Sequence, residues 1–314
     1  MRSSSGVNLA AAKQPSRFVK FLQKDDFWGY LFITPQLVGF LAFALFPIVI
    51  SIYLCFSEWN FLEPPKFVGL QNIQAVFADK NRFLYFAITN TAVFVFSIVP
   101  LTMAFSLFLA LMLHRPLPGR QLYKIAYFLP FVTASAAVSL LWYWLLAPDL
   151  GLINTALAGL GIEGPLWLQD PTWSKPAVIL YITWQSVGYC YLLFAAGLKQ
   201  VPSEFYEAAR IDGASPFHQF RYITLPLLSP TTFFVMITMM IGCFNLFGEV
   251  YVLTRGQGGP IYSTYTIVLY IYQLAFVFFR MGEAAVVSWI LFGILFTLTA
   301  LNFRLSHLWV HFVE

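Results

Sequence analysis

The chain has 314 residues, of which 59% are hydrophobic and only 10% carry a charge, and its mean hydropathy is +0.73. So few charged side chains cannot cover a water-soluble globule of this size, which excludes a soluble fold and predicts an integral membrane protein. The formal net charge of +4 comes from basic residues scattered through short segments without a long cluster. Nucleic acid is therefore not an expected partner, and membrane topology explains the basic residues better.

Residues 1–28 are polar and lack an apolar stretch followed by a small-residue cleavage site. They are therefore predicted to form a cytoplasmic N-terminal tail and not a signal peptide. Within this tail Phe18, Phe21 and Leu22 recur at helical spacing, which is equally compatible with a short helix on the membrane surface and with disorder. Residues 29–314 are predicted to form one transmembrane domain.

Six apolar stretches are long enough to cross a hydrocarbon core, which needs roughly 20 helical residues. They cover residues 30–56, 87–113, 122–146, 176–198, 228–253 and 284–305. Lipid offers no hydrogen-bonding partner to backbone amides, so these continuous runs predict an all-α integral membrane fold with six transmembrane helices. Pro47, Pro100 and Pro130 are predicted to kink their helices.

The basic residues predict the orientation of these helices. With the N-terminus inside and six crossings, twelve of the 18 lysine and arginine residues fall on the cytoplasmic side, as the positive-inside rule requires. Both termini of this multi-pass protein are therefore predicted to be cytoplasmic. The segment Thr264–Phe279 is apolar but has only 16 residues, so it is predicted to be an external helix lying at the membrane surface; a seventh crossing is the alternative.

A polar, charged island, Glu207–Pro230, separates the fourth apolar stretch from the fifth. We expect two short helices joined by a turn there. Ser203 can cap the first helix with its hydroxyl, Gly213 can adopt the positive φ of a turn, and Pro216 is tolerated in the first turn of the second helix. The predicted orientation places this helix-turn-helix in the cytoplasm.

The spacing of residues in this island resembles the signature loop of permease subunits in binding-protein-dependent ABC importers. A Glu-Ala-Ala triplet is followed after three residues by glycine and after nine more by Ile-x-Leu-Pro. The resemblance implies that residues 199–226 form a loop that couples the permease to an ATPase. The residues expected to form the coupling site are Glu207, Ala208, Ala209, Asp212, Gly213, Ile223, Leu225 and Pro226.

Other stretches resemble the carbohydrate-uptake branch of these permeases, which includes maltose, other oligosaccharide and glycerol-phosphate systems. They include Pro65–Ile73, Ile88–Phe94, Trp142–Asn154, Trp167–Pro171 and Gly258–Pro260. The resemblance implies the ABC importer permease fold. It also implies the partners: a second homologous permease subunit, two cytoplasmic ATPase subunits, an extracytoplasmic solute-binding protein and membrane lipid.

The chain has no Gly-x4-Gly-Lys-Ser/Thr sequence, so a phosphate-cradling loop for ATP is not predicted. ATP and magnesium are expected on the partner ATPase subunits, no cofactor is expected in this chain, and the chain is expected to be a transport subunit and not an enzyme. His307 and His311 stand four residues apart, but only Glu314 is close enough in sequence to be a third ligand, so no metal site is predicted. Three cysteines without paired spacing are expected to be packing residues: Cys55, Cys190 and Cys243.

Polar side chains within the apolar stretches are candidates for a substrate pathway, because burying them in lipid is costly unless they meet a partner or water. They are Gln185, Ser186, Tyr189, Asn245 and Glu249. A sugar would use amides, hydroxyls and aromatic faces of this kind. Ser186 and Tyr189 also hold positions that look like those used for sugar contact in maltose-type subunits. Hydrogen bonding between helices, without a ligand, is an equally good explanation for each.

These observations together predict a permease subunit of a bacterial ABC importer in the cytoplasmic membrane. It would translocate an oligosaccharide, a related sugar or glycerol phosphate by alternating access. The alternative is an ion-coupled secondary transporter, which needs a carboxylate near the middle of the membrane or broken helices for its ion. Only Glu249 comes close to that requirement.

Overall fold

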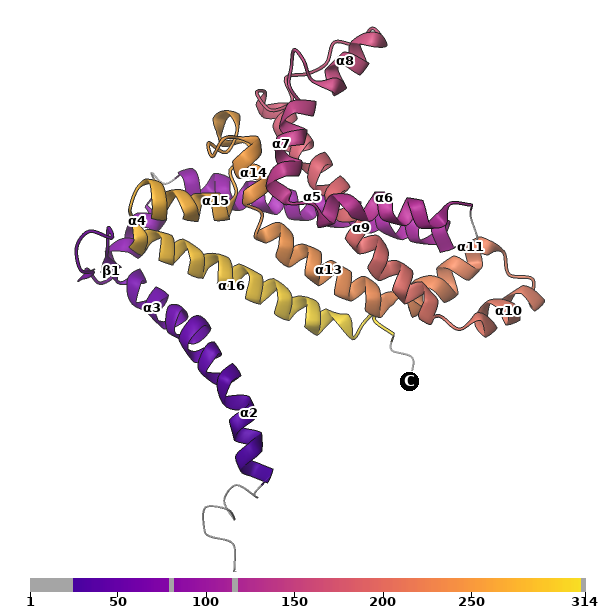
Figure 1. Ribbon diagram of the computed structural model, residues 1–314, viewed down its shortest axis with the longest axis horizontal. Helices are drawn as coiled ribbons and strands as arrows, with labels where there is room; N and C mark the ends of the chain where they lie inside the picture. The colour runs from indigo at the N-terminus through magenta and orange to yellow at the C-terminus, as the bar shows by residue number, and fades with distance from the viewer. Residues whose placement is uncertain (1–24, 79–81, 115–117, 312–314) are drawn as a thin grey trace, which may run out of the picture. The chain divides into compact units, whose positions relative to one another are not determined.

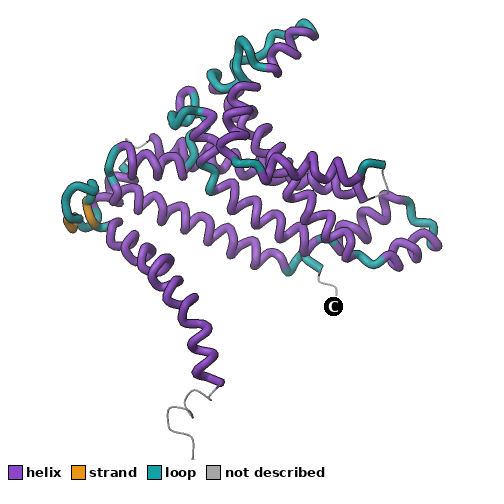
Figure 2. Tube along the Cα trace, viewed as in Figure 1, coloured by secondary structure: helices purple, strands orange, loops and turns teal. Residues whose placement is uncertain are grey.

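The computed structural model describes residues 25–78, 82–114 and 118–311, and helices dominate it (Figures 1 and 2). Two short strands, β1 (Ser57–Glu58) and β2 (Lys66–Phe67), form an antiparallel hairpin. Because helices make up nearly all of the regular structure of the described residues, the predicted all-α class is confirmed. The chain divides into two compact units, residues 1–54 and 55–314, and each is described by itself. The helix considered at Phe18–Leu22 lies outside the described residues, and the boundary at residue 28 stays a prediction.

The first unit is a helical rod made of α2 (Asp25–Phe40), the π-helical segment η1 (Leu41–Leu45) and α3 (Phe46–Cys55). Its helix begins before residue 30, where the first apolar stretch was expected to start. The π-helical segment ends two residues before Pro47, which has no N–H to close a regular turn. The backbone is thus distorted at the place where a proline kink was predicted.

The second unit is built on two long helices, α5 (Arg82–His114, 33 residues) and α9 (Pro171–Gln200, 30 residues), which pack along each other (Figure 1). Asp170 caps α9 by accepting a 2.7 Å hydrogen bond from the backbone N–H of Thr172. Ser106 of α5 donates to the carbonyl oxygen of Val187 at 3.0 Å. Pro100 lies inside α5 without interrupting it. These two helices form the frame on which the other elements pack.

The third predicted crossing, residues 122–146, is not one straight helix. It divides into α6 (Arg120–Val132) and α7 (Ser135–Leu145), which are bent by 99° from each other. Thr133 ends α6 because its backbone is extended, while its N–H and its hydroxyl still donate to the carbonyl oxygen of Leu129, at 3.1 and 2.8 Å. Ala134 is also non-helical, and α7 begins after it. The bend predicted at Pro130 is present, a few residues farther along the chain.

The fifth predicted crossing, residues 228–253, is also interrupted. It contains α13 (Ser229–Phe244) and the short α14 (Gly248–Leu253), separated by three non-helical residues. The side-chain amide of Asn245 donates to the carbonyl oxygen of Ile241 at 2.8 Å, a local bond that competes with continuation of the helix. Gly197 of α9 allows a close approach of α13, because a Cβ at this position would overlap Thr231.

The last long helix is α16 (Met281–Ser306). By length and composition four helices of the described chain could cross a membrane, and up to six if each of two bent pairs is one crossing. The four are Trp28–Cys55, α5, α9 and α16, and the bent pairs are α6 with α7 and Pro216–Leu227 with α13. The six predicted crossings correspond to these six segments; most ends differ by several residues, but the fifth segment begins at Pro216 instead of residue 228 and ends at Phe244 instead of residue 253.

The apolar segment Thr264–Phe279 contains α15 (Ile267–Tyr272), which continues as the π-helical η4 (Gln273–Val277). A helix of this length spans about 16 Å, about half of the roughly 30 Å hydrocarbon core. By length this helix is therefore not counted among the segments that could cross a membrane, which favours the external helix, and the seventh crossing stays the untested alternative. The helix packs against α5 and α16, with Ile267 and Leu269 buried. Its predicted place at the outer membrane surface stays a prediction.

Candidate functional site

The first helix within the predicted coupling loop, residues 199–226, is α10 (Ser203–Ile211). The expected cap by the Ser203 hydroxyl is wrong: Pro202 holds the N-cap position and Ser203 is already the first helical residue, without a capping hydrogen bond. Pro202 has an extended backbone and follows Val201, so the chain leaves α9 and enters α10 across two residues. The helix itself lies where the sequence predicts it.

Gly213 makes the turn, as predicted. Its φ is +77°, in the left-handed region that glycine adopts without steric cost. Two backbone bonds close the end of α10 around it: Gly213 N–H to the Arg210 carbonyl at 3.1 Å and Ala214 N–H to the Ala209 carbonyl at 2.8 Å. This pair of bonds is the Schellman pattern, which requires a left-handed residue at the glycine position.

The second helix, α11 (Pro216–Gln219), begins after Ser215, whose hydroxyl accepts from the backbone N–H of His218 at 3.4 Å. It continues through the π-helical η2 (Phe220–Thr224) into α12 (Leu225–Leu227). The Gln219 side chain donates to the carbonyl oxygen of Ala214 at 3.0 Å, which ties this helix to the turn.

A hydrogen bond that the sequence analysis missed closes the loop. The hydroxyl groups of Tyr206 in α10 and Thr224 in η2 lie 2.9 Å apart, and Thr224 is buried. Both residues lie within the predicted coupling loop, residues 199–226, with Tyr206 just before Glu207 and Thr224 between Ile223 and Leu225. Two hydroxyl side chains at fixed places in a loop were the available signal, but their pairing depends on the turn at Gly213.

The predicted coupling residues divide into two groups by exposure. The exposed group consists of Glu207, Ala208, Asp212 and Gly213. The half-buried group consists of Ala209, Ile223, Leu225 and Pro226. The exposed surface of the loop also carries large apolar side chains that were not predicted as site residues. They are Ile211, which is 87% exposed, Phe217, which is 70% exposed, and Tyr222, which is 71% exposed.

A cavity of about 480 Å³ lies between the loop and the long helices. Leu111 and His114 from the end of α5 and Leu198 from α9 line one side, and Tyr206 and Arg210 line the other. The Tyr206–Thr224 bond thus joins the two helical parts of the loop to each other, and this cavity lies beside them.

The five candidate pathway residues lie in two places. Gln185, Ser186 and Tyr189 are on α9, where Gln185 is buried and the other two are half-buried. The ring of Tyr189 stacks on Phe131 of α6, with centroids 4.7 Å apart and planes inclined by 18°. Gln185 and Tyr189, four residues apart, share one face of the helix.

Asn245 and Glu249 lie at the break between α13 and α14. Asn245 is exposed and its amide is used within its own helix, as described above. Glu249 is half-buried in the first turn of α14 and near enough to Tyr181 of α9 for an electrostatic interaction. Glu249 therefore lies within electrostatic range of α9, whereas the side-chain amide of Asn245 is bonded within α13.

Comparison with known proteins adds the family. Residues 71–308 match the family described as "Binding-protein-dependent transport system inner membrane component". A probable ABC transporter permease protein of Bacillus subtilis, YesP, is 36% identical over 307 residues, which are 97% of each chain. The lactose transport system permease protein LacF of Rhizobium radiobacter is 36% identical, covering 88% of this chain and 93% of the relative.

A solved structure has the same fold. It is a bacterial ABC transporter involved in the import of the acidic polysaccharide alginate, and its matching chain superposes with a TM-score of 0.78 at 22% sequence identity. The match covers 92% of this chain and 98% of the other. The chain belongs to the family of inner-membrane components of binding-protein-dependent transport systems, and within it to the ABC importer permeases, which are transport subunits and not enzymes.

Proposed function

We propose that this chain moves an oligosaccharide or a related sugar across the bacterial cytoplasmic membrane by alternating access, driven by two cytoplasmic ATPase subunits. The observation that carries the proposal is the coupling loop, a compact helix-turn-helix closed by Gly213 and by the bond between Tyr206 and Thr224. The lactose permease among its relatives supports a sugar as the substrate. ATP and magnesium would be bound by the ATPase subunits, and both termini of this chain would be cytoplasmic.

The exposed surface of the coupling loop suits a protein partner. Ile211, Phe217 and Tyr222 are largely exposed, and each large apolar side chain that a partner buries contributes about 1.5–3 kcal/mol. The carboxylates of Glu207 and Asp212 lie on the same loop and are also exposed. An ATPase cleft with apolar walls and basic residues at its rim would complement this surface.

Movement of the loop would reach the helices through short, tight connections. The loop follows α9 directly and leads through α12 into α13. Gly197 of α9 lies against Leu228 and Thr231 at the start of α13, so closely that a Cβ on the glycine would overlap them. A displacement of the loop by ATPase closure would therefore carry the inner ends of α9 and α13 together.

The pathway for the sugar would lie along α9, beside Gln185, Ser186 and Tyr189. The amide and the hydroxyl groups can exchange hydrogen bonds with sugar hydroxyls, and the ring of Tyr189 offers an aromatic face. Asn245 and Glu249, at the break between α13 and α14, would add acceptors and donors. A second homologous permease subunit would complete the pathway, and an extracytoplasmic solute-binding protein would deliver the sugar.

Reconstitution tests this proposal. The chain is co-expressed with its neighbouring permease, ATPase and binding-protein genes and placed in liposomes with ATP inside or outside, and uptake of labelled oligosaccharides is measured. We expect uptake that requires ATP and the binding protein and that persists when ionophores abolish ion gradients. Uptake without ATP that ionophores abolish would identify an ion-coupled secondary transporter instead. Uptake of glycerol phosphate without sugar uptake would refute the proposed substrate.

A further inference from the structure

Two neighbouring residues of α5 make contacts that the coupling loop and the pathway do not explain. Asn90 and Thr91 belong to the stretch Ile88–Phe94 and are 2% and 1% exposed. The amide of Asn90 donates to the carbonyl oxygens of Tyr262 and Tyr265, at 2.7 and 3.1 Å. These partners are more than 170 residues away in the sequence.

Thr91 holds the next residues of the same distant segment. Its hydroxyl accepts from the backbone N–H of Ile267 at 3.0 Å and donates to the carbonyl oxygen of Ala87 at 2.7 Å. A third contact comes from α9, where the hydroxyl of Ser174 lies 2.7 Å from that of Ser263, with both groups buried. Asn90, Thr91 and Ser174 are called the outer clasp below.

The outer clasp holds the segment Gly256–Ile267, called the outer loop, which follows α14, includes the short helix η3 (Pro260–Tyr262) and ends at the first residue of α15. The outer loop has an unusual backbone. Its three glycines have φ between +76° and +78°, and two side-chain-bearing residues, Ile261 and Tyr262, also have positive φ, of +51° and +57°. Such conformations persist only where surrounding contacts impose them.

Other bonds complete the support of the outer loop. The hydroxyl of Tyr265 donates to Gln273 Oε1 at 2.6 Å, and the amide nitrogen of Gln273 donates to the Gly256 carbonyl at 2.7 Å. Burial raises the pKa of Tyr265, which keeps this donor protonated. With its base fixed in this way, the loop still exposes Ile261 by 76%. The bonds of the outer clasp and of Gln273 thus fix the backbone of the outer loop, and the side chain of Ile261 is left exposed on it.

We propose that Asn90, Thr91 and Ser174 are positioning residues that fix the outer loop to α5 and α9, so that contact with the solute-binding protein outside is transmitted along α9 to the coupling loop. The inference rests on the proposed function. The outer clasp attaches the loop at Ser174 in the first turn of α9, and the first helix of the coupling loop follows the other end of α9 at Ser203. A helix of 30 residues joins the two sites over about 45 Å.

The substitution Thr91→Val tests the outer clasp with little change in shape. It removes the acceptor for the Ile267 N–H and leaves that buried donor unpaired, whereas Thr91→Ser keeps the acceptor. Each variant of the complete reconstituted complex is assayed for ATP hydrolysis against the concentration of liganded binding protein. For Thr91→Val we expect the half-maximal concentration to rise, or the stimulation to fall, by about tenfold, with basal hydrolysis within about twofold of wild type. Thr91→Ser should stay close to wild type.

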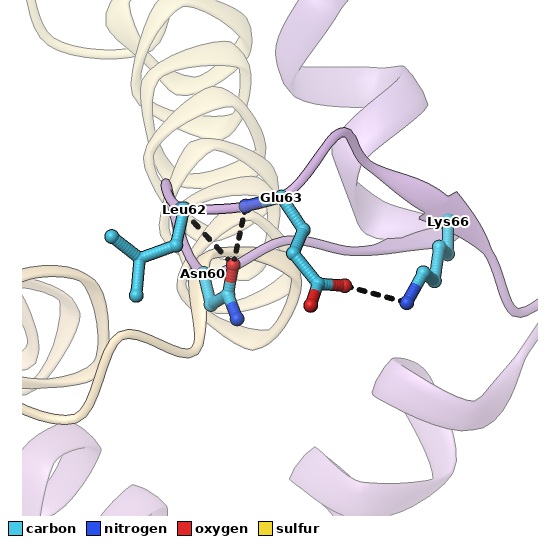
Figure 3. Close-up of polar contacts among 4 residues, drawn as sticks. All are labelled: Asn60, Leu62, Glu63 and Lys66. Carbon is cyan, nitrogen blue, oxygen red and sulfur yellow. Dashed lines mark hydrogen bonds and ion pairs between the residues drawn. The ribbon is translucent and has the colours of Figure 1, made fainter.

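A matched pair of asparagine substitutions gives an independent test. Asn90→Asp replaces two donated hydrogen bonds by a carboxylate facing two carbonyl oxygens, and should lower the stimulation as Thr91→Val does. Asn60→Asp is the control, because its Oδ1 already accepts from the N–H groups of Leu62 and Glu63, both at 3.1 Å (Figure 3), and a carboxylate keeps both bonds. The nearby ion pair of Glu63 and Lys66, at 2.6 Å, is also left intact.

Hydrogen exchange measured on the complete complex shows whether the substitution loosens the outer loop, separately from its effect on ATP hydrolysis. In Thr91→Val the backbone amides of residues 256–267 should exchange faster than in wild type, while those of the coupling loop keep their rates. If the liganded binding protein stimulates ATP hydrolysis in the wild-type complex and stimulates it equally in Thr91→Val and Asn90→Asp, the inference is overturned and the proposed function stands. A wild-type complex without any stimulation by a binding protein would overturn the proposed function, and the inference with it.

Discussion

The turn at Gly213 gives the sharpest prediction about the coupling loop. Its φ of +77° lies in the left-handed region, and a Cβ added there would meet no atom within 4 Å. A substitution is therefore opposed by backbone conformation alone and not by a clash. The cost for a residue with a side chain is roughly 1–2 kcal/mol, at the upper end for a β-branched residue and lower for asparagine.

This cost can be converted into an expected loss of coupling. A free energy of 1–2 kcal/mol corresponds to a factor of about 5–30 in the ratio of native to non-native turn. Gly213→Val should lower ATP-driven uptake by about that factor in reconstituted complexes, whereas Gly213→Asn should lose no more than a few-fold. The measurements are uptake and substrate-stimulated ATP hydrolysis at equal amounts of assembled complex.

Gly293 offers a matched control for this prediction. It lies exposed in α16, with no atom within 4 Å of an added Cβ and without a positive φ. Gly293→Val should change stability by no more than about 0.5 kcal/mol, because valine and glycine differ little in helix propensity. Equal uptake by Gly213→Val, Gly213→Asn and wild type would refute the reasoning, since it would mean that the loop does not need a left-handed residue there.

Three further predictions concern the loop and the topology. Glu207→Lys should leave membrane insertion intact but weaken binding of the ATPase by roughly 2–5 kcal/mol, and co-purification of the ATPase measures this loss. Undiminished co-purification and transport would exclude Glu207 from the contact. Tyr206→Phe removes the bond to Thr224 and should destabilise the loop by about 0.5–1.5 kcal/mol, seen as faster hydrogen exchange in residues 203–224, and unchanged exchange would count against the bond. Single cysteines at Gln257 and Phe278, in a background without native cysteines, should both react with an impermeant thiol reagent added outside, because the 11-residue helix between them is too short to cross the membrane. Protection of the cysteine at Phe278 alone would contradict this prediction.

The helices were predictable from sequence because their signal is local. Apolar runs mark the segments, and Gly213 marks the turn through its own conformational freedom. The breaks were harder. Pro130 indicated the bend in the third segment, but its 99° angle depends on the backbone of Thr133 and Ala134. The end of α13 depends on Asn245, whose helix-breaking bond competes with a strongly apolar run.

The contacts that organise the candidate sites were not predictable, because they join residues far apart in the chain. Tyr206 meets Thr224 only once the loop has turned, so no local pattern could pair them. Asn90 stood out only as part of a motif, since its partners lie in the outer loop. The exposure of Ile211 is likewise a property of the folded loop, whereas its apolar character was visible in the sequence.

The central claim is that the helix-turn-helix between α9 and α13 is the docking element for an ATPase. A photo-crosslinking amino acid placed at Ile211, which is 87% exposed, tests it in intact cells that express the whole transporter. Leu160 is the matched control, because it is also apolar and 78% exposed but belongs to the segment after α8 (Leu152–Gly159), which the predicted topology places outside. We predict an adduct with the ATP-binding subunit from Ile211 and none from Leu160. An ATPase adduct from Leu160, or its absence from Ile211, would contradict the claim.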